Sequence, residues 1–125
     1  MCMERKFVVA IDVDGTILEH KFPDLGKLLP DAKEVINDLY DEGCYIIIWT
    51  CRSGFELNEI RTFLDYSCIK YHAVNTNAPF DMIGFMPSPK IFYDLIIDDK
   101  NLGGLPDWKT IYKMVIEAKK KFDNE

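Results

Sequence analysis

The sequence contains no apolar stretch that approaches the roughly 20 residues needed for a membrane-spanning helix. Its opening residues, Met-Cys-Met-Glu-Arg-Lys, also lack the apolar segment of a secretory signal peptide. We therefore expect a soluble, cytoplasmic protein with no membrane partner.

An excess of positive charge is missing as well. The chain has 15 Lys and Arg against 21 Asp and Glu, which gives a formal net charge of −6 and a pI near 4.9. General nucleic-acid surfaces and surfaces that bind anionic membranes need a basic patch. Such partners are therefore not expected, although a local basic pocket remains compatible with this composition.

What the sequence does contain is three continuous apolar runs, each followed by acidic or hydroxyl residues. The runs cover residues 7–11, 45–49 and 95–97, and the residues after them are Asp12-Val13-Asp14-Gly15-Thr16, Thr50 and Asp98-Asp99. Continuous rather than alternating hydrophobicity is typical of strands that are covered on both faces. At 125 residues the chain fits one domain, residues 1–125. The pattern predicts a single-domain α/β fold, a doubly wound, Rossmann-like parallel sheet with flanking helices.

Helix signals lie between and after these runs. Asp31 and Ser53 are predicted N-caps, and Gly43 is predicted to end the first helix. A third helix is expected to have Asp107 in its first turn. Residues 71–74 predict a short third strand, whereas residues 75–89 show no regular pattern.

A long loop from Gly15 through Pro30 follows the first acidic motif. Loops of this length in compact domains are often functional. We interpret it as a mobile flap, since the chain has no room for a separate cap domain.

The acidic residues are expected to meet at one edge of the sheet. Ligands of open α/β sheets bind beyond the carboxyl ends of the strands, where Asp12, Asp14, Asp98 and Asp99 would repel one another unless a cation shared the site. Hard divalent cations prefer oxygen ligands. We therefore predict a Mg²⁺ site formed by these four residues, with Asp14 contributing its backbone carbonyl.

The same residues predict phosphoryl chemistry. A carboxylate such as Asp12 can attack a phosphate and form an aspartyl-phosphate, while Asp14 can act as general acid and base. Gly15 permits a sharp exit from the strand. Amides near Thr50, at the start of a helix, would bind phosphoryl oxygens. The predicted phosphate-binding residues are Gly15, Thr16, Thr50, Cys51 and Arg52.

Cys51 is interpreted as a neighbour of the site rather than its nucleophile. A phosphatase with a cysteine nucleophile would need an Arg at position 57, where this chain has Leu57. The four cysteines form no closely spaced metal-binding pairs, which indicates free thiols in a reducing compartment.

The ordered set of Asp12 to Thr16, Thr50 and Asp98-Asp99 resembles the first, second and fourth motifs of the haloacid dehalogenase (HAD) superfamily of phosphohydrolases. In that family the first Asp is the nucleophile and the second is the acid and base, here Asp12 and Asp14. The second Asp marks the phosphatases of the superfamily, so the resemblance does not imply dehalogenation.

Three longer segments resemble a subgroup of small, capless HAD-like proteins of bacteria and phages. These are residues 19–23, 49–52 and 97–104. Capless members tend to act on large substrates or to borrow a neighbouring subunit as a lid. The resemblance therefore implies a possible homo-oligomer that supplies a lid.

The family's third motif is a Lys or Arg that screens the nucleophile and the phosphate. Lys90 is the only Lys or Arg between Lys70 and Asp98, and we assign it this catalytic role on condition that the chain before residue 95 bends back. Arg52 and Lys100 stand beside motifs and are the alternatives.

Several functions remain open at this point. The leading hypothesis is a Mg²⁺-dependent phosphomonoesterase that acts on a small phosphorylated metabolite or sugar. The alternative is a nucleotide or polynucleotide 3′-end phosphatase, because Arg52 resembles the Ser-Gly-Arg segment of polynucleotide kinase-phosphatases. Non-enzymatic alternatives are a catalytically silent phosphate-binding module and a receiver-like module, although receivers carry their acidic pair on the first strand and this chain carries it on the last.

Overall fold

A four-stranded parallel sheet organises the computed structural model, which describes residues 5–79 and 89–125. Its strands are β1 (Val8–Ile11), β2 (Tyr45–Ile48), β3 (Ala73–Val74) and β4 (Leu95–Ile97), in the spatial order β3-β2-β1-β4. In the register, Val9 of β1 lies between Ile46 of β2 and Leu95 of β4. All four residues of β1 are buried. The continuous apolar runs therefore form the centre of the sheet, as predicted.

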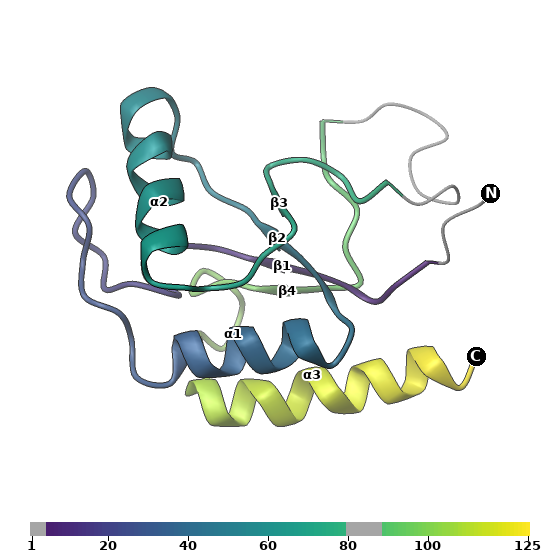
Figure 1. Cartoon of the computed structure of the whole chain (residues 1–125). Helices are drawn as coiled ribbons and strands as arrows, with labels where there is room; N and C mark the ends of the chain where they lie inside the picture. Colours follow the sequence, from purple (N-terminus) through teal and green to yellow (C-terminus); the bar gives the residue numbers. More distant parts are fainter. Residues whose placement is uncertain (1–4, 80–88) are drawn as a thin grey trace.

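In the part of the chain that the structure describes, three helices pack on one face of this sheet. They are α1 (Ala32–Asp41), α2 (Gly54–Tyr66) and α3 (Trp108–Asp123), and α1 and α3 lie side by side beneath the strands in Figure 1. Their buried residues share one core with β1 and β2, formed around Val9, Ile11, Ile46 and Ile48. The predicted Rossmann-like α/β class is confirmed, and the described residues include no cap domain.

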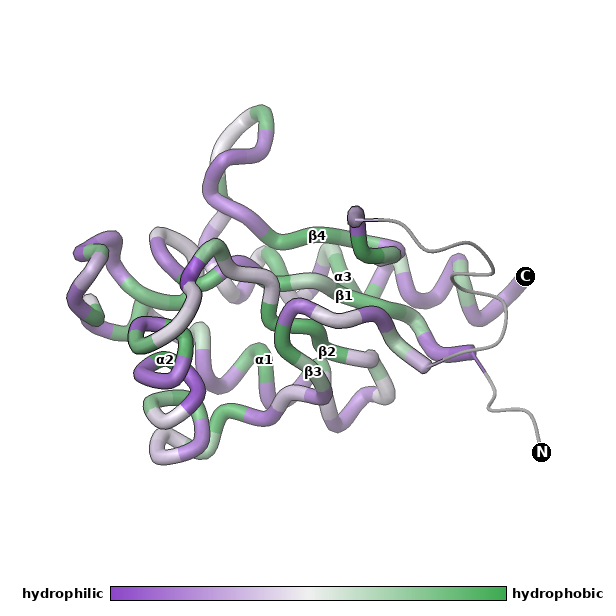
Figure 2. The backbone as a smooth tube through the Cα atoms, turned by 90° about the horizontal axis from the view of Figure 1, so that it is seen from above, coloured by the Kyte–Doolittle hydropathy of each residue, from purple (hydrophilic) through white to green (hydrophobic). Residues whose placement is uncertain are grey.

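The opposite face of the sheet is covered in part by the described ends of the connection from β3 to β4, within residues 75–79 and 89–94. Ala78 and Ile91 pack there against Val8, Ala10 and Ile47. Figure 2 shows hydrophobic residues following one another along β1 and β4. Residues 80–88, which belong to the stretch without a regular sequence pattern, lie outside the described residues.

The helix starts differ in detail from the sequence prediction. Asp31 and Ser53 do occupy the N-cap positions of α1 and α2, but neither side chain makes a capping hydrogen bond. Asp107 is not in the first turn of α3. Its extended backbone makes it the N-cap, and its carboxylate accepts a hydrogen bond from the N–H of Thr110 at 3.0 Å.

The flap (residues 15–30) stands at the end of the sheet where the strands finish, at the left of Figure 1. Hydrogen bonds from Glu19 N–H to the Lys27 carbonyl and from Leu29 N–H to the Ile17 carbonyl draw its two sides together. An isolated bridge also joins Leu18 and Leu28. The two sides of the flap are therefore hydrogen-bonded to each other, and the flap lies beside the carboxyl ends of the strands.

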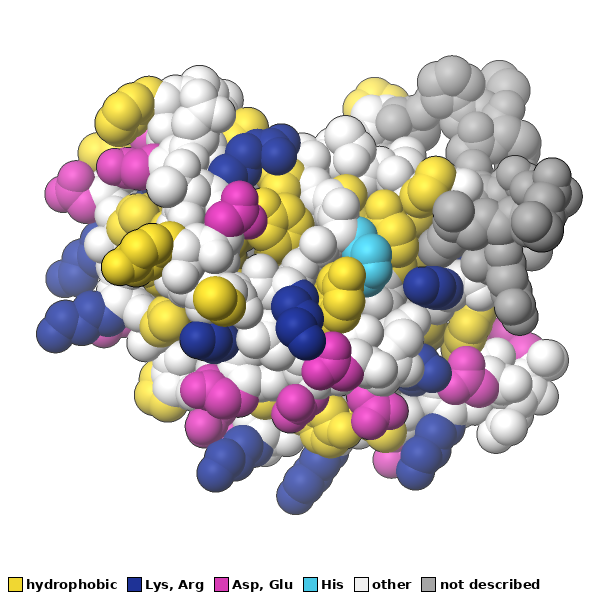
Figure 3. Space-filling view, viewed as in Figure 1, with side chains coloured by type: hydrophobic (Ala, Val, Ile, Leu, Met, Phe, Trp, Pro, Cys, Tyr) yellow, Lys and Arg dark blue, Asp and Glu magenta, His cyan; other side chains and the backbone are white. Residues whose placement is uncertain are grey.

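The outer surface carries charges of both signs. On the face shown in Figure 3, basic and acidic side chains are intermixed over α1 and α3. Within the described part of the chain, no helix combines the length and the apolar character that a membrane span requires.

Candidate active site

Three carboxylates converge where β1 and β4 end. Asp12 follows β1, while Asp98 and Asp99 follow β4, and the pairing of these adjacent strands brings one oxygen of each carboxylate within 4.8 Å of the others. The N–H of Asp12 also donates to the Ile97 carbonyl at 3.0 Å, which continues the strand pairing into the site. Clustered carboxylate oxygens are the ligands that hard divalent cations prefer. Among the described residues, this cluster could hold a metal ion.

The negative charges in this cluster repel one another. Burial, together with the nearby charge of Asp98, raises the pKa of Asp12 to about 7. A hydrogen bond from the Thr16 hydroxyl opposes this shift only in part. A bound cation would reverse the balance because it favours the ionised form of each ligand. The number, type and spacing of the donors therefore fit a divalent metal.

Thr16 and Gly15 contact the carboxylates of this cluster. The buried Thr16 hydroxyl accepts the Asp99 N–H at 3.0 Å and lies 3.1 Å from Asp12 Oδ2 and 3.3 Å from Asp99 Oδ1. Gly15 has φ +90°, and a Cβ at this position would overlap Asp99 Oδ2. Its N–H donates to the Leu18 carbonyl at 2.8 Å. The Thr16 hydroxyl and the Gly15 amide, which the sequence assigned to phosphate, thus have partners within the protein.

Trp108, at the start of α3, fixes the same turn. Its buried indole Nε1–H donates to the Thr16 carbonyl at 3.0 Å. The last helix is thereby joined directly to the loop that carries the first acidic motif.

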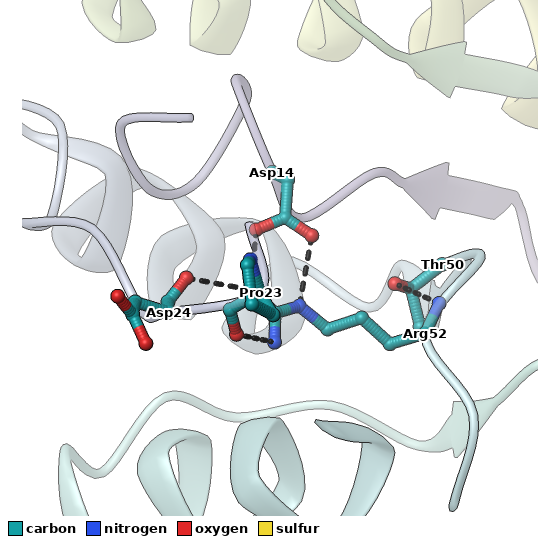
Figure 4. A network of polar contacts seen from close by, with 5 residues as sticks. All are labelled: Asp14, Pro23, Asp24, Thr50 and Arg52. Atoms are coloured by element: carbon teal, nitrogen blue, oxygen red, sulfur yellow. Dashed lines mark hydrogen bonds and ion pairs between the residues drawn. The ribbon is translucent and has the colours of Figure 1, made fainter. Parts of the chain in front are cut away.

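Asp14 is not part of the three-carboxylate cluster and pairs with Arg52. The guanidinium donates from Nε to Asp14 Oδ2 at 2.8 Å and from Nη2 to Asp14 Oδ1 at 2.7 Å, as Figure 4 shows. Pairing with Asp14 raises the pKa of Arg52 above its ordinary value. The Asp14 carboxylate therefore does not join the metal-like cluster, and a metal contact through its backbone carbonyl stays a prediction.

Thr50 is held by a residue that the sequence pattern did not indicate. Asn75 Oδ1 accepts the Thr50 N–H, and Asn75 Nδ2 donates to the Thr50 carbonyl, both at 2.9 Å. The Thr50 hydroxyl accepts the Arg52 N–H at 3.1 Å. Asn75 is a polar residue just after a strand, which is the kind of position that the other motifs occupy. Because β3 is only two residues long, its sequence pattern is weak and does not single out Asn75.

A cavity of about 340 Å³ lies between the carboxylate cluster and Arg52 at the carboxyl edge of the sheet. Its lining residues are Asp12, Asp14, His20, Phe22, Thr50, Cys51, Arg52, Asp98, Asp99 and Lys100. Two of them, His20 and Phe22, come from the flap. Cys51 and Lys100 are exposed. The strand order thus brings residues from all three predicted motifs to one cavity.

Lys90 is not among the residues that line this cavity. Its ammonium lies 5.2 Å from the centre of the Tyr93 ring. Of the three basic residues considered from the sequence, Arg52 and Lys100 reach the cavity wall. The predicted catalytic role of Lys90 therefore gains no support from its position.

Comparisons with known proteins agree with this geometry. The family model of haloacid dehalogenase-like hydrolases matches residues 9–77, which include the first acidic motif and Thr50. A solved structure of a conserved protein from Bacteroides thetaiotaomicron is 38% identical, with a TM-score of 0.82, and the match covers 92% of this chain and 93% of that one. A search of curated proteins finds no match. The chain belongs to the family of haloacid dehalogenase-like hydrolases.

Proposed function

We propose that the protein is a Mg²⁺-dependent phosphomonoesterase that acts on a small phosphorylated metabolite or sugar through an aspartyl-phosphate. One observation carries this proposal. A half-buried carboxylate, Asp12, lies in a metal-like cluster with Asp98 and Asp99, and Asp14 lines the same cavity two residues away. This arrangement offers a nucleophile, a cation site and an acid-base group together.

The metal would be held by Asp12, Asp98 and Asp99. When bound, Mg²⁺ would offset the negative charges of the nucleophile and of the phosphoryl oxygens. Lys100, exposed at the cavity wall, would add positive charge for the phosphate. Among the described residues, the Thr50 hydroxyl accepts the Arg52 N–H and donates to no acceptor, so its proton would be available for a phosphoryl oxygen.

The reaction then takes two balanced steps. Asp14 first takes up a proton from solvent. An Asp12 oxygen then attacks phosphorus, the bond from phosphorus to the leaving oxygen breaks, and Asp14 gives that oxygen its proton. In the second step Asp14 takes a proton from water, whose oxygen attacks phosphorus while the bond to Asp12 breaks. Inorganic phosphate leaves, Asp14 releases its proton to solvent, and both aspartates return to their starting states.

The cavity favours a small substrate. A volume of about 340 Å³ lies at the lower end of the range for small-molecule sites, which is about 300–1,000 Å³. The flap supplies part of the wall from the same chain, through His20 and Phe22. A lid from a second copy of the chain stays a prediction, as does a cytoplasmic location.

The alternatives lack a comparable observation. A polynucleotide phosphatase would use Arg52 to bind substrate phosphate, but the side chain of Arg52 is only 1% exposed. A receiver-like module is disfavoured because the match to the hydrolase family includes the first two motifs of the site.

The proposal is tested with purified protein and a panel of sugar phosphates, nucleotides and 3′-phosphorylated oligonucleotides, with and without Mg²⁺. We expect Mg²⁺-dependent release of phosphate from small substrates, and loss of at least about 10³-fold in Asp12→Asn. Asp41→Asn, which changes an exposed ion pair with Lys70 outside the cavity, is the matched control. Hydrolysis by Asp12→Asn at the wild-type rate would contradict the aspartyl-phosphate mechanism, and a wild type inactive on every substrate would leave a phosphate-binding role.

A further inference from the structure

Arg52 is almost fully committed to partners within the protein. Besides its two bonds to Asp14, its Nη1 donates to the Pro23 carbonyl at 3.1 Å and its Nη2 to the Asp24 carbonyl at 2.9 Å. Four of the five N–H groups of the guanidinium are therefore used. With a side chain only 1% exposed, Arg52 offers little to a phosphate group.

The burial of this charge requires an explanation. An ionised side chain is costly to remove from water unless its charge is paired and its donors are satisfied. Here one carboxylate and two carbonyls meet both demands, and the planar fork of a guanidinium matches them in a way that a lysine ammonium does not. The surroundings of residue 52 therefore fit the shape and charge of an arginine.

The partners of Arg52 belong to two different parts of the site. Asp14 is the proposed acid-base group, whereas Pro23 and Asp24 belong to the flap. Figure 4 shows the guanidinium between them. Phe22, which lines the cavity from the flap, places its ring centre 5.1 Å from the guanidinium carbon. A single side chain therefore contacts both the acid-base group and the flap wall of the cavity.

We propose that Arg52 is a positioning residue that fixes Asp14 and the flap relative to each other, and that it does not bind the substrate phosphate. This inference rests on the proposed function for its link to catalysis. The group that protonates the leaving oxygen and the wall that faces the leaving group are then held in one arrangement. Substrates that need protonation of the leaving group depend on Arg52 most.

The kinetic test compares two substrates in the wild type, Arg52→Gln and Arg52→Lys. An alkyl phosphate needs a proton on its leaving oxygen, whereas p-nitrophenyl phosphate releases a stable phenolate. Acid-base groups contribute about 10²–10⁴-fold. We expect kcat/KM of Arg52→Gln to fall about 100-fold for the alkyl ester and less than about 10-fold for the aryl ester, with unchanged inhibition by inorganic phosphate.

Two further variants sharpen this test. Arg52→Lys should not restore the alkyl ester activity, because an ammonium cannot form the paired bonds to Asp14. The double variant Asp14→Asn/Arg52→Gln should be no worse on the alkyl ester than Asp14→Asn alone, since both changes remove the same function. Equal losses on both esters, with weaker inhibition by phosphate, would overturn the proposal and make Arg52 a phosphate-binding residue.

A second measurement does not depend on activity. In Arg52→Gln, we expect hydrogen exchange at the amides of Glu19 and Asp24, which are bonded within the flap, to increase at least about 10-fold. Arg61→Gln, which changes an exposed arginine of α2, should leave both rates unchanged. If Arg52→Gln does not fold, Asp14→Asn serves instead because it breaks the paired bonds.

Unchanged exchange in the folded variant would overturn the coupling between Arg52 and the flap. A wild type without phosphatase activity would contradict the proposed function, and the exchange measurement would still decide whether Arg52 holds the flap.

Discussion

Asn75 hydrogen-bonds both backbone groups of Thr50, and in doing so it extends the sheet beyond the end of β3. His72 does the same at the other end of this strand, where its Nδ1 accepts the N–H of Ile46 at 2.9 Å. The two-residue β3 is thus lengthened by a side chain on each side. This short strand nevertheless fixes both the edge of the sheet and the position of Thr50 at the cavity wall.

Asn75→Ala should lower stability and activity together. Loss of two hydrogen bonds to half-buried backbone groups is expected to cost about 1–3 kcal/mol of unfolding free energy. Thr50 would also lose its fixed position, which should lower kcat/KM. Chemical denaturation and steady-state kinetics measure both effects. Asn75→Asp, which keeps an acceptor for the Thr50 N–H but loses the donor, should lie between wild type and Asn75→Ala. Wild-type values for Asn75→Ala would contradict the assigned role.

His72 should make stability depend on pH. Burial, and to a lesser degree the charge of Lys6, lowers the pKa of His72, so its protonated form is favoured in the unfolded chain. The stabilisation is present above the unfolded pKa of about 6.5 and is lost as pH falls towards the lower folded pKa. Protonation would also remove the acceptor for the Ile46 N–H.

The measurement for His72 is the melting temperature between pH 8 and pH 5. His72→Gln is the reference, because it cannot titrate and its flanking tyrosines, Tyr40 and Tyr45, remain. The wild type should lose more stability than this variant as the pH falls through 6. Parallel curves for the two proteins would contradict the prediction.

Mg²⁺ should stabilise the folded protein through Asp98. A ligand at 100 times its Kd adds about 2.7 kcal/mol to the unfolding free energy, and it would also relieve the repulsion that raises the pKa of Asp12. Thermal melts with and without Mg²⁺ should show a large increase in the wild type and a small one in Asp98→Ala. Asp41→Asn should behave as the wild type, and equal increases in all three proteins would exclude Asp98 as a ligand.

Comparing variants of Lys100 and Lys90 identifies the basic residue that screens the phosphate. Lys100 is exposed at the cavity wall, whereas Lys90 is not among its lining residues. We expect Lys100→Ala to reduce kcat/KM about 10- to 100-fold, because it removes a charge from the phosphate site. Lys90→Ala should remain within about twofold of wild type. The reverse order would return the catalytic role to Lys90.

Much of the fold follows from local patterns. The runs before Asp12, Thr50 and Asp98 are apolar without interruption because β1, β2 and β4 are covered on both faces. Parallel strands then place their carboxyl ends at one edge, so the meeting of the three motifs could be predicted without coordinates.

What could not be predicted is the direction of individual side chains. Asp12 and Asp14 stand two residues apart, yet one faces the carboxylate cluster and the other faces Arg52. This difference depends on hydrogen bonds that form only in the folded chain, from Thr16 to Asp12 and from the distant Arg52 to Asp14. The position of Asn75 after a strand marks it only as a polar residue at a strand end, because its bonds to Thr50 depend on β3 lying beside β2.

The hydrogen bond from Trp108 to the Thr16 carbonyl has a consequence for the way the protein matures. The turn that carries Asp12 and Asp14 is hydrogen-bonded to the first residue of α3, which follows every acidic residue of the site along the chain. A nascent chain released before this helix docks would contain every acidic residue of the site but lack an indole to hold their loop. The metal-like cluster is therefore expected to form only once α3 has docked, so that a chain without this helix has no prepared site.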